Sequence, residues 1–183
     1  MSSPDLRGVA SRQTPLPTKV ALVATLVLTG VATALFVSRR SAASVDPQFA
    51  SRFLWLFSGL FVLRVVGQLV VRRRGSSLLP PTEDWNLAPY RLLLPAQMAI
   101  LGLMAWINIE VTRGVGIAAT SRPALGTALV WLSCVYAGAM AVRYVVRMVR
   151  RPDERWFGGT IPIVFHEVLA AYLYVLGTFY ASD

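Results

Sequence analysis

Apolar residues in this chain gather into five long runs, and short polar stretches separate each run from the next. The runs cover residues 20–37, 53–71, 92–111, 124–149 and 161–180. Each has about 20 residues, the length an α-helix needs to cross a hydrocarbon core of roughly 30 Å. The pattern predicts an all-α integral membrane protein in which residues 19–183 form one compact bundle of five transmembrane helices. Residues 1–18 are polar and rich in proline, so we expect a flexible N-terminal tail.

The first run is longer than a typical secretory signal core, and Arg39 and Arg40 follow it at once. This arrangement favours a retained membrane anchor, with cleavage near Ala42 as the alternative. Thr160, which can cap a helix N-terminus, directly precedes the fifth run, and Pro162 lies in its first turn, where proline is tolerated.

Small residues recur on one face of the first span and on one face of the fourth. Such faces let helix backbones approach closely in lipid. The alternative is that they serve only ordinary packing. The two faces consist of Thr25, Thr29 and Thr33 in the first span and Cys134, Gly138 and Ala141 in the fourth.

Composition agrees with the membrane class. Of 183 residues 55% are hydrophobic, and the mean hydropathy is +0.56. The net charge of +9 does not indicate nucleic-acid binding, because the arginines lie at the edges of apolar runs and form no soluble basic face. A single cysteine, Cys134, excludes an internal disulfide. Glycine-rich nucleotide motifs, HExxH and GxSxG are absent from the sequence.

The distribution of basic residues predicts the orientation. The N-terminal tail, the 72–91 region and the 143–155 region share one side of the predicted bundle and hold twelve basic residues, against five on the other side. The positive-inside rule then puts the N-terminus in the cytoplasm and the C-terminus outside. Two basic clusters on the predicted cytoplasmic side are candidates for contact with anionic lipids. They comprise Arg72, Arg73, Arg74, Arg147, Arg150 and Arg151.

Several polar residues fall at one predicted depth inside the spans. Arg64 lies eight residues before Arg72, or about 12 Å into the membrane. His166 lies six residues after Thr160, or about 9 Å in. An ionisable group within a span is costly and suggests a functional site. The full layer comprises Arg64, Gln68, Gln97, Arg143, His166 and Glu167.

This layer has a functional and a structural interpretation. As a polar pocket on the cytoplasmic side, its excess positive charge would suit an anionic head group, a quinone oxygen or a propionate. His166 could transfer protons or serve as an axial ligand to haem or a chlorophyll-type pigment. Alternatively Arg64 and Arg143 extend toward the interface, and Glu167 pairs with one of them to lock helix packing. His166 and Glu167 are neighbours on a helix and therefore point about 100° apart.

The spans hold too few histidine, cysteine and carboxylate side chains for a zinc or di-iron site. Glu110 and Arg113 look like a surface ion pair of little energetic value. The sequence therefore favours a subunit or scaffold of a larger membrane complex, in contact with other subunits or with copies of itself. The alternative is a membrane enzyme or redox protein that handles a lipid-soluble or anionic ligand. A multi-pass protein of the bacterial inner membrane is the expected setting.

Overall fold

The computed structural model describes residues 16–40, 45–74, 90–150 and 160–182. Five of its helices are long and apolar enough to cross a membrane, which confirms the predicted five-span, all-helical class for the described residues. Leu16 to Thr18, which we expected in the flexible tail, are already helical, and the remainder of that tail lies outside the described residues. The elements are α1 (Leu16–Arg39), α2 (Pro47–Arg74), α3 (Tyr90–Arg113), η3 (Ile117–Ala119), α4 (Pro123–Arg150) and α5 (Ile161–Ala181).

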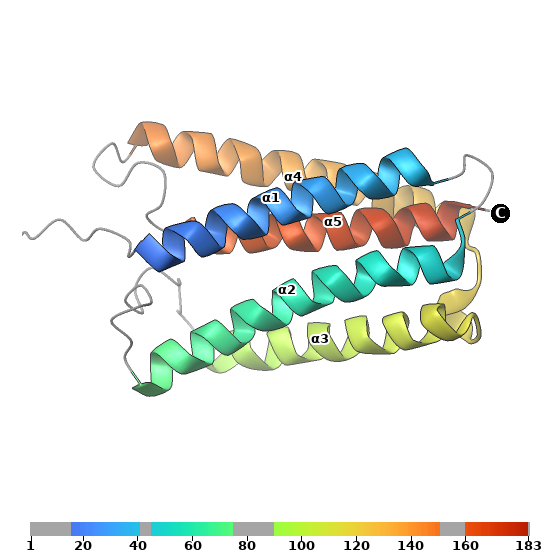
Figure 1. Ribbon diagram of the computed structural model, residues 1–183, viewed down its shortest axis with the longest axis horizontal. Helices are drawn as coiled ribbons and strands as arrows, with labels where there is room; N and C mark the ends of the chain where they lie inside the picture. The colour runs from blue at the N-terminus through green and yellow to red at the C-terminus, as the bar shows by residue number, and fades with distance from the viewer. Residues whose placement is uncertain (1–15, 41–44, 75–89, 151–159, 183) are drawn as a thin grey trace, which may run out of the picture.

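Helix α5 forms the centre of the bundle (Figure 1). It packs against α4, α2 and α1, whereas α3 packs on the far side of α2. In its most apolar window 72% of the α5 residues are buried, against 11% for α4. Successive long helices run in opposite directions along the bundle (Figure 1). The span that carries the only histidine is therefore the one against which α1, α2 and α4 all pack.

Helices α4 and α5 cross at two glycines. A Cβ atom added to Gly126 would lie 2.3 Å from the Ala181 nitrogen and 2.6 Å from the Gly177 carbonyl oxygen. One added to Gly177 would lie 2.8 Å from the Val130 nitrogen. Only glycine permits this approach of the two backbones, as in other close helix crossings in lipid.

The threonine stripe of α1 faces the bundle. Thr25 and Thr29 are buried, which confirms their predicted packing against other helices, and Thr33 is half-buried. The Thr29 hydroxyl donates a 2.7 Å hydrogen bond to the Thr25 carbonyl oxygen, one turn back. Bonds of this kind satisfy the hydroxyls where no water is available.

The small face expected on α4 has a different environment. Cys134, Gly138 and Ala141 are exposed, and a Cβ atom at Gly138 would meet no other atom within 4 Å. Close packing of α4 instead uses Gly126, on another part of the helix. The sequence showed that α4 has small residues but not which of them touches α5.

Two helix starts show how local chemistry sets boundaries. The Asp46 carboxylate accepts a 2.8 Å hydrogen bond from the Phe49 backbone amide, and Pro47 is the first residue of α2. Both features are typical of an N-terminus. Thr160 holds the N-cap position of α5, but its side chain makes no capping hydrogen bond.

The connection between α3 and α4 is organised by Glu110. Its carboxylate accepts hydrogen bonds from the Trp106 indole, at 2.8 Å, and from the Ala118 backbone amide, at 2.7 Å. The expected ion pair with Arg113 is therefore wrong: within the described residues this carboxylate binds an indole and a loop amide. The Glu110 side chain closes the turn that carries η3.

Gly116 in this turn should not tolerate a side chain. Its φ is +100°, and an added Cβ would lie 2.4 Å from the Glu110 carboxylate. We expect Gly116→Ala to lower the free energy of unfolding by about 1–3 kcal/mol, because it adds backbone strain and displaces the carboxylate. Chemical or thermal unfolding in detergent measures this change.

Gly114→Ala is the matched control. Gly114 also has a positive φ, +65°, but its Cβ would meet nothing within 4 Å. Gly114→Ala should therefore lower the free energy of unfolding by less than Gly116→Ala does. The expected loss comes from backbone strain alone and is about 1–2 kcal/mol. Equal losses for the two variants would mean that the Glu110 contact does not stabilise the loop.

Candidate functional site

The six candidate polar residues come from four helices, and their exposure differs. Arg64 and Gln68 on α2 and Gln97 on α3 are buried. His166 and Glu167 on α5 are half-buried, and Arg143 on α4 is exposed. We therefore divide the predicted layer into an interior part, on α2 and α3, and an accessible edge, on α4 and α5.

Tyr136 on α4 lies among the charged candidates. It interacts electrostatically with Arg64, Arg143 and Glu167, and its ring lies 5.7 Å from the His166 ring, edge to face. Tyr136 is not among the six residues of the predicted layer. Its position seven residues before Arg143, on the same helix face, is the signal that would have identified it.

Arg64 is buried without an acceptor. Its side chain is 7% exposed, and its Nε–H has no hydrogen-bond partner among the described residues. The guanidinium carbon lies 5.7 Å from the centre of the Phe165 ring. A cation over an aromatic face gains about 0.5–2 kcal/mol. That is less than the several kcal/mol that taking a cation out of water costs.

The two glutamines extend the interior part of the site. Asn108 donates a 2.8 Å hydrogen bond to Ser58, which fixes the register of the antiparallel pair α2 and α3. Gln68 lies ten residues after Ser58 on α2, and Gln97 lies about ten residues before Asn108 on α3. Because the two helices run in opposite directions, Gln68 and Gln97 lie at the same depth. The Nε2 atom of each is buried with no hydrogen-bond partner in the described structure. Together with Arg64, the site thus contains three helix-borne donors that lack acceptors.

His166 has a defined tautomer. Its Nδ1 contacts the carbonyl oxygen of Pro162, one turn earlier in α5. A carbonyl only accepts hydrogen bonds, so Nδ1 carries a proton, and in the neutral form of the ring Nε2 keeps a lone pair. The contact also fixes the ring orientation. No group of three histidine, cysteine or carboxylate side chains that could hold a metal occurs in the described part of the chain.

Glu167 faces a different part of the molecule. It lines a groove between α1 and α4 whose floor is α5. Within the described residues it makes no ion pair or hydrogen bond with Arg64 or Arg143, so the predicted pairing is not formed. The angular separation of neighbouring helix positions puts His166 and Glu167 in separate sites.

The α1–α4 groove has two adjoining parts with volumes of about 610 Å³ and about 340 Å³. Glu167 and Leu26 line both. Most of the remaining lining of the larger part is small, and α1 and α4 both pack on α5 without packing extensively on each other. These small residues include Thr29, Gly30, Thr33, Ala34, Ser133, Cys134, Ala137, Ala170 and Ala171.

A second polar network lies deeper in the bundle, and sequence reasoning missed it. Asn108 is fully buried; it donates to Ser58 and accepts a 3.1 Å hydrogen bond from the Tyr172 hydroxyl. Nearby, Thr112 accepts a hydrogen bond from the Trp55 indole at 3.0 Å. These side chains satisfy one another, so we assign them a role in holding α2, α3 and α5 together.

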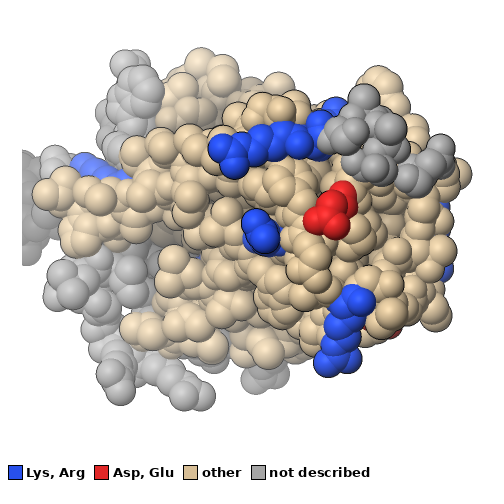
Figure 2. Space-filling model, turned by 45° about the vertical axis from the view of Figure 1, so that its right-hand side comes forward, with Lys and Arg blue, Asp and Glu red and all other residues tan. Residues whose placement is uncertain are grey.

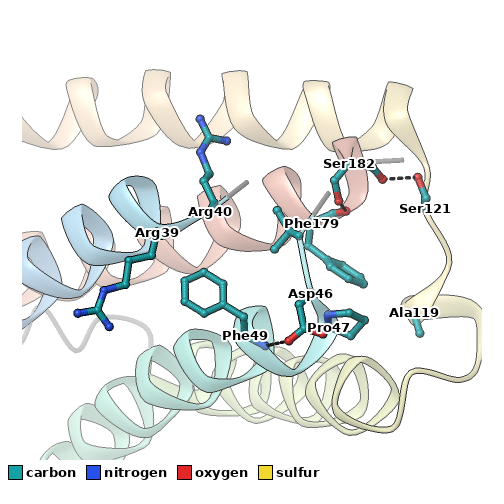
Figure 3. Close-up of a pocket in the computed structure, with 10 residues that line it drawn as sticks. Arg39, Arg40, Asp46, Pro47, Phe49, Ala119, Ser121, Phe179 and Ser182 are labelled. Carbon is teal, nitrogen blue, oxygen red and sulfur yellow. Dashed lines mark hydrogen bonds between the residues drawn. The ribbon is translucent and has the colours of Figure 1, made fainter. Parts of the chain in front are cut away.

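A third hollow, of about 630 Å³, lies at the end of the bundle where α1 ends and α2 begins. Figure 2 shows separate basic side chains and acidic side chains on an otherwise uncharged face. Figure 3 shows Arg39 and Arg40 at the hollow, directed away from each other, and the Ser121 hydroxyl bonded to the Ser182 carbonyl oxygen at 2.8 Å. Asp46 serves there as a helix cap. The groups around this hollow chiefly close the end of the bundle.

The candidate lipid-contact arginines are only partly described. Arg147 and Arg150 lie in the last turn of α4. The side chains of Arg72, Arg73 and Arg74 and all of Arg151 lie outside the described residues. Lipid binding by these clusters stays a prediction.

Comparison of the chain with known protein families, with curated proteins and with solved structures finds no match in any of the three.

Proposed function

We propose that this multi-pass membrane protein is a subunit of a larger membrane assembly and binds a transmembrane helix of another subunit in the α1–α4 groove. The observation that carries the proposal is Glu167, a half-buried carboxylate on the groove floor that pairs with neither nearby arginine. A carboxylate at this depth is costly unless a cation accompanies it. The occupant we propose therefore carries a lysine or arginine at the depth of Glu167 on an otherwise apolar helix.

The dimensions of the groove favour a helix over a small ligand. Along α1 the lining runs from Leu22 to Ser38, or about 24 Å. This is most of a hydrocarbon core of roughly 30 Å. The small residues of the lining would let a partner backbone approach closely, the usual basis of helix association in lipid.

We also propose a bacterial inner membrane as the setting, with the cytoplasmic N-terminus that the distribution of arginine supports. In that orientation Arg72, Arg73, Arg74, Arg147, Arg150 and Arg151 would meet the anionic lipids of the cytoplasmic leaflet.

Charge reversal at Glu167 tests the proposed docking. We expect Glu167→Lys to reduce recovery of the partner from native membranes by about a hundredfold or more, since breaking a buried charge pair costs roughly 3–5 kcal/mol. Changing the partner's basic residue to glutamate should restore recovery of the Glu167→Lys protein. Co-purification with quantitative mass spectrometry measures both. Unchanged recovery of the same partner with Glu167→Lys would contradict the proposal.

The chain's single cysteine allows an independent test of the proposed docking. Cys134 lines the groove, so a photocrosslinker attached there should label a basic-residue helix of the partner. The matched control places the crosslinker at Leu103→Cys in a Cys134→Ala background, because Leu103 is 53% exposed on α3, away from the groove. Labelling of lipid alone from both positions would contradict a helix in the groove, and labelling of a second copy of this chain would make the assembly a homo-oligomer.

A second function is favoured by a separate observation. The unpartnered Nε–H of buried Arg64 supports a membrane enzyme or redox protein that binds a ligand at the cluster of Arg64, Arg143, Tyr136 and His166. A subunit of a membrane complex can have both features, since His166 and Glu167 point about 100° apart on α5.

A further inference from the structure

We infer that the cluster around Arg64 and His166 binds a lipid-soluble hydroquinone, a ring hydroxyl of which donates to His166 Nε2 and accepts from Arg64. This inference rests on the second function proposed above, the ligand-binding one, and specifies its ligand. It concerns binding of the reduced ring and assigns no electron transfer to this chain.

The depth of the cluster restricts the ligand to molecules that dissolve in hydrocarbon. Arg64 lies eight residues before Arg72, or about 12 Å along the helix. That distance is more than a third of a hydrocarbon core of roughly 30 Å. A lipid head group stays at the interface, so it would not reach this depth without deforming the bilayer. The ligand has to carry its own polar groups into the apolar layer.

The hydrogen-bonding groups of the site require both a donor and an acceptor. Within the described residues Arg64 Nε–H has no hydrogen-bond acceptor, so a ligand that reaches it has to present an oxygen. His166 Nε2 keeps a lone pair because Nδ1 is held by the Pro162 carbonyl, so the ligand has to present a hydrogen. A hydroxyl group provides both at one atom.

Aromatic side chains and positive charge select the kind of hydroxyl. The rings of Tyr136 and Phe165 lie at the cluster, the first 5.7 Å from the His166 ring and the second beneath Arg64. Flat aromatic ligands gain from such ring contacts. Arg64 and Arg143 both interact electrostatically with Tyr136 and His166, so they would stabilise negative charge on a ligand oxygen. A phenolic oxygen takes on more negative charge than the oxygen of an aliphatic alcohol, so the two arginines favour a phenol. A carboxylate ligand would suit the arginines but would face the lone pair of Nε2.

The site has an accessible edge toward the membrane. Helices α2 and α4 pack on α5 but not extensively on each other, and His166 and Tyr136 are half-buried while Arg143 is exposed. A ligand dissolved in lipid can therefore approach His166 and Tyr136 before it reaches the buried guanidinium.

The experiment uses the full-length protein, stripped of bound lipid in detergent, with decylubiquinol kept reduced as the probe. His166 is the only histidine, so histidine labelled with ¹⁵N gives the imidazole signals of one residue. We expect saturable one-to-one binding of decylubiquinol and a shift of the Nε2 resonance on binding. Arg64→Met and His166→Phe should each weaken binding by roughly tenfold or more, the effect of losing one strong hydrogen bond.

Glu167→Gln is the matched control. Glu167 is the next residue on α5 but lines the α1–α4 groove, so its variant should change the affinity for decylubiquinol far less than Arg64→Met or His166→Phe does. A Glu167 variant that loses the partner helix but still binds decylubiquinol would separate the groove proposal from this one. So would a His166→Phe protein that loses decylubiquinol binding but keeps the partner helix. Full affinity in Arg64→Met and His166→Phe would overturn the inference. So would absence of binding to the unchanged protein, or binding of oleate in place of decylubiquinol.

Discussion

Gly126→Ala should greatly reduce the stability of the bundle. The added Cβ would lie 2.3 Å from the Ala181 nitrogen and 2.7 Å from the Tyr180 carbonyl carbon. These are backbone atoms, so no side-chain rotation relieves the overlap, and α4 would have to move away from α5. We expect a loss of about 3 kcal/mol or more, the upper range for overpacking. Thermal unfolding of the purified protein in detergent, followed by circular dichroism, measures it.

Gly138→Ala is the control on the same helix. Its Cβ would meet nothing within 4 Å, and alanine is the better helix former by about 0.8–1 kcal/mol in water. Its thermal midpoint should therefore stay the same or rise slightly. Gly177→Ala should behave like Gly126→Ala, because its Cβ would lie 2.9 Å from the Gly126 carbonyl oxygen. If both variants unfold at the temperature of the unchanged protein, the close crossing of α4 and α5 does not form in the membrane.

Arg64→Met should stabilise the ligand-free protein. The buried guanidinium has an unpartnered Nε–H and a 5.7 Å ring contact in place of a carboxylate. Replacing buried ionic groups with apolar side chains of similar volume is often neutral or stabilising by about 1–4 kcal/mol. An increase of this size in the free energy of unfolding would mean that the arginine is retained for something other than folding. Equilibrium unfolding after removal of bound lipid gives the value.

Arg52→Met tests whether any arginine on α2 has this effect. Arg52 is exposed near the start of the same helix, so its replacement should change the unfolding free energy by less than about 0.5 kcal/mol. Should Arg64→Met prove less stable than the unchanged protein, the guanidinium contributes to the fold, and the structural interpretation of the polar layer would be favoured.

The sequence by itself determined the membrane class and the number of spans. Each span follows from a run of apolar residues that matches the bilayer thickness, and the bilayer forces such a run to be helical because its backbone groups find no water. The depth of Arg64 and His166 also followed from local rise per residue, since a helix fixes distances along its own axis. These properties depend on the contact of each span with lipid and not on its contacts with other parts of the chain.

Only the tertiary structure decided which helix is central and which faces meet. All five spans are apolar around most of their circumference, so hydrophobic pattern cannot distinguish a lipid-facing side from a buried one. That is why Gly138 was expected in a close-packed face while Gly126 makes the contact, and why Glu110 binds Trp106 and Ala118 and not Arg113. The separation of Glu167 from Arg64 has the same origin. Depth brings two residues to one level, but the rotation of each helix about its axis, set by contacts between backbones and small side chains, determines whether they touch.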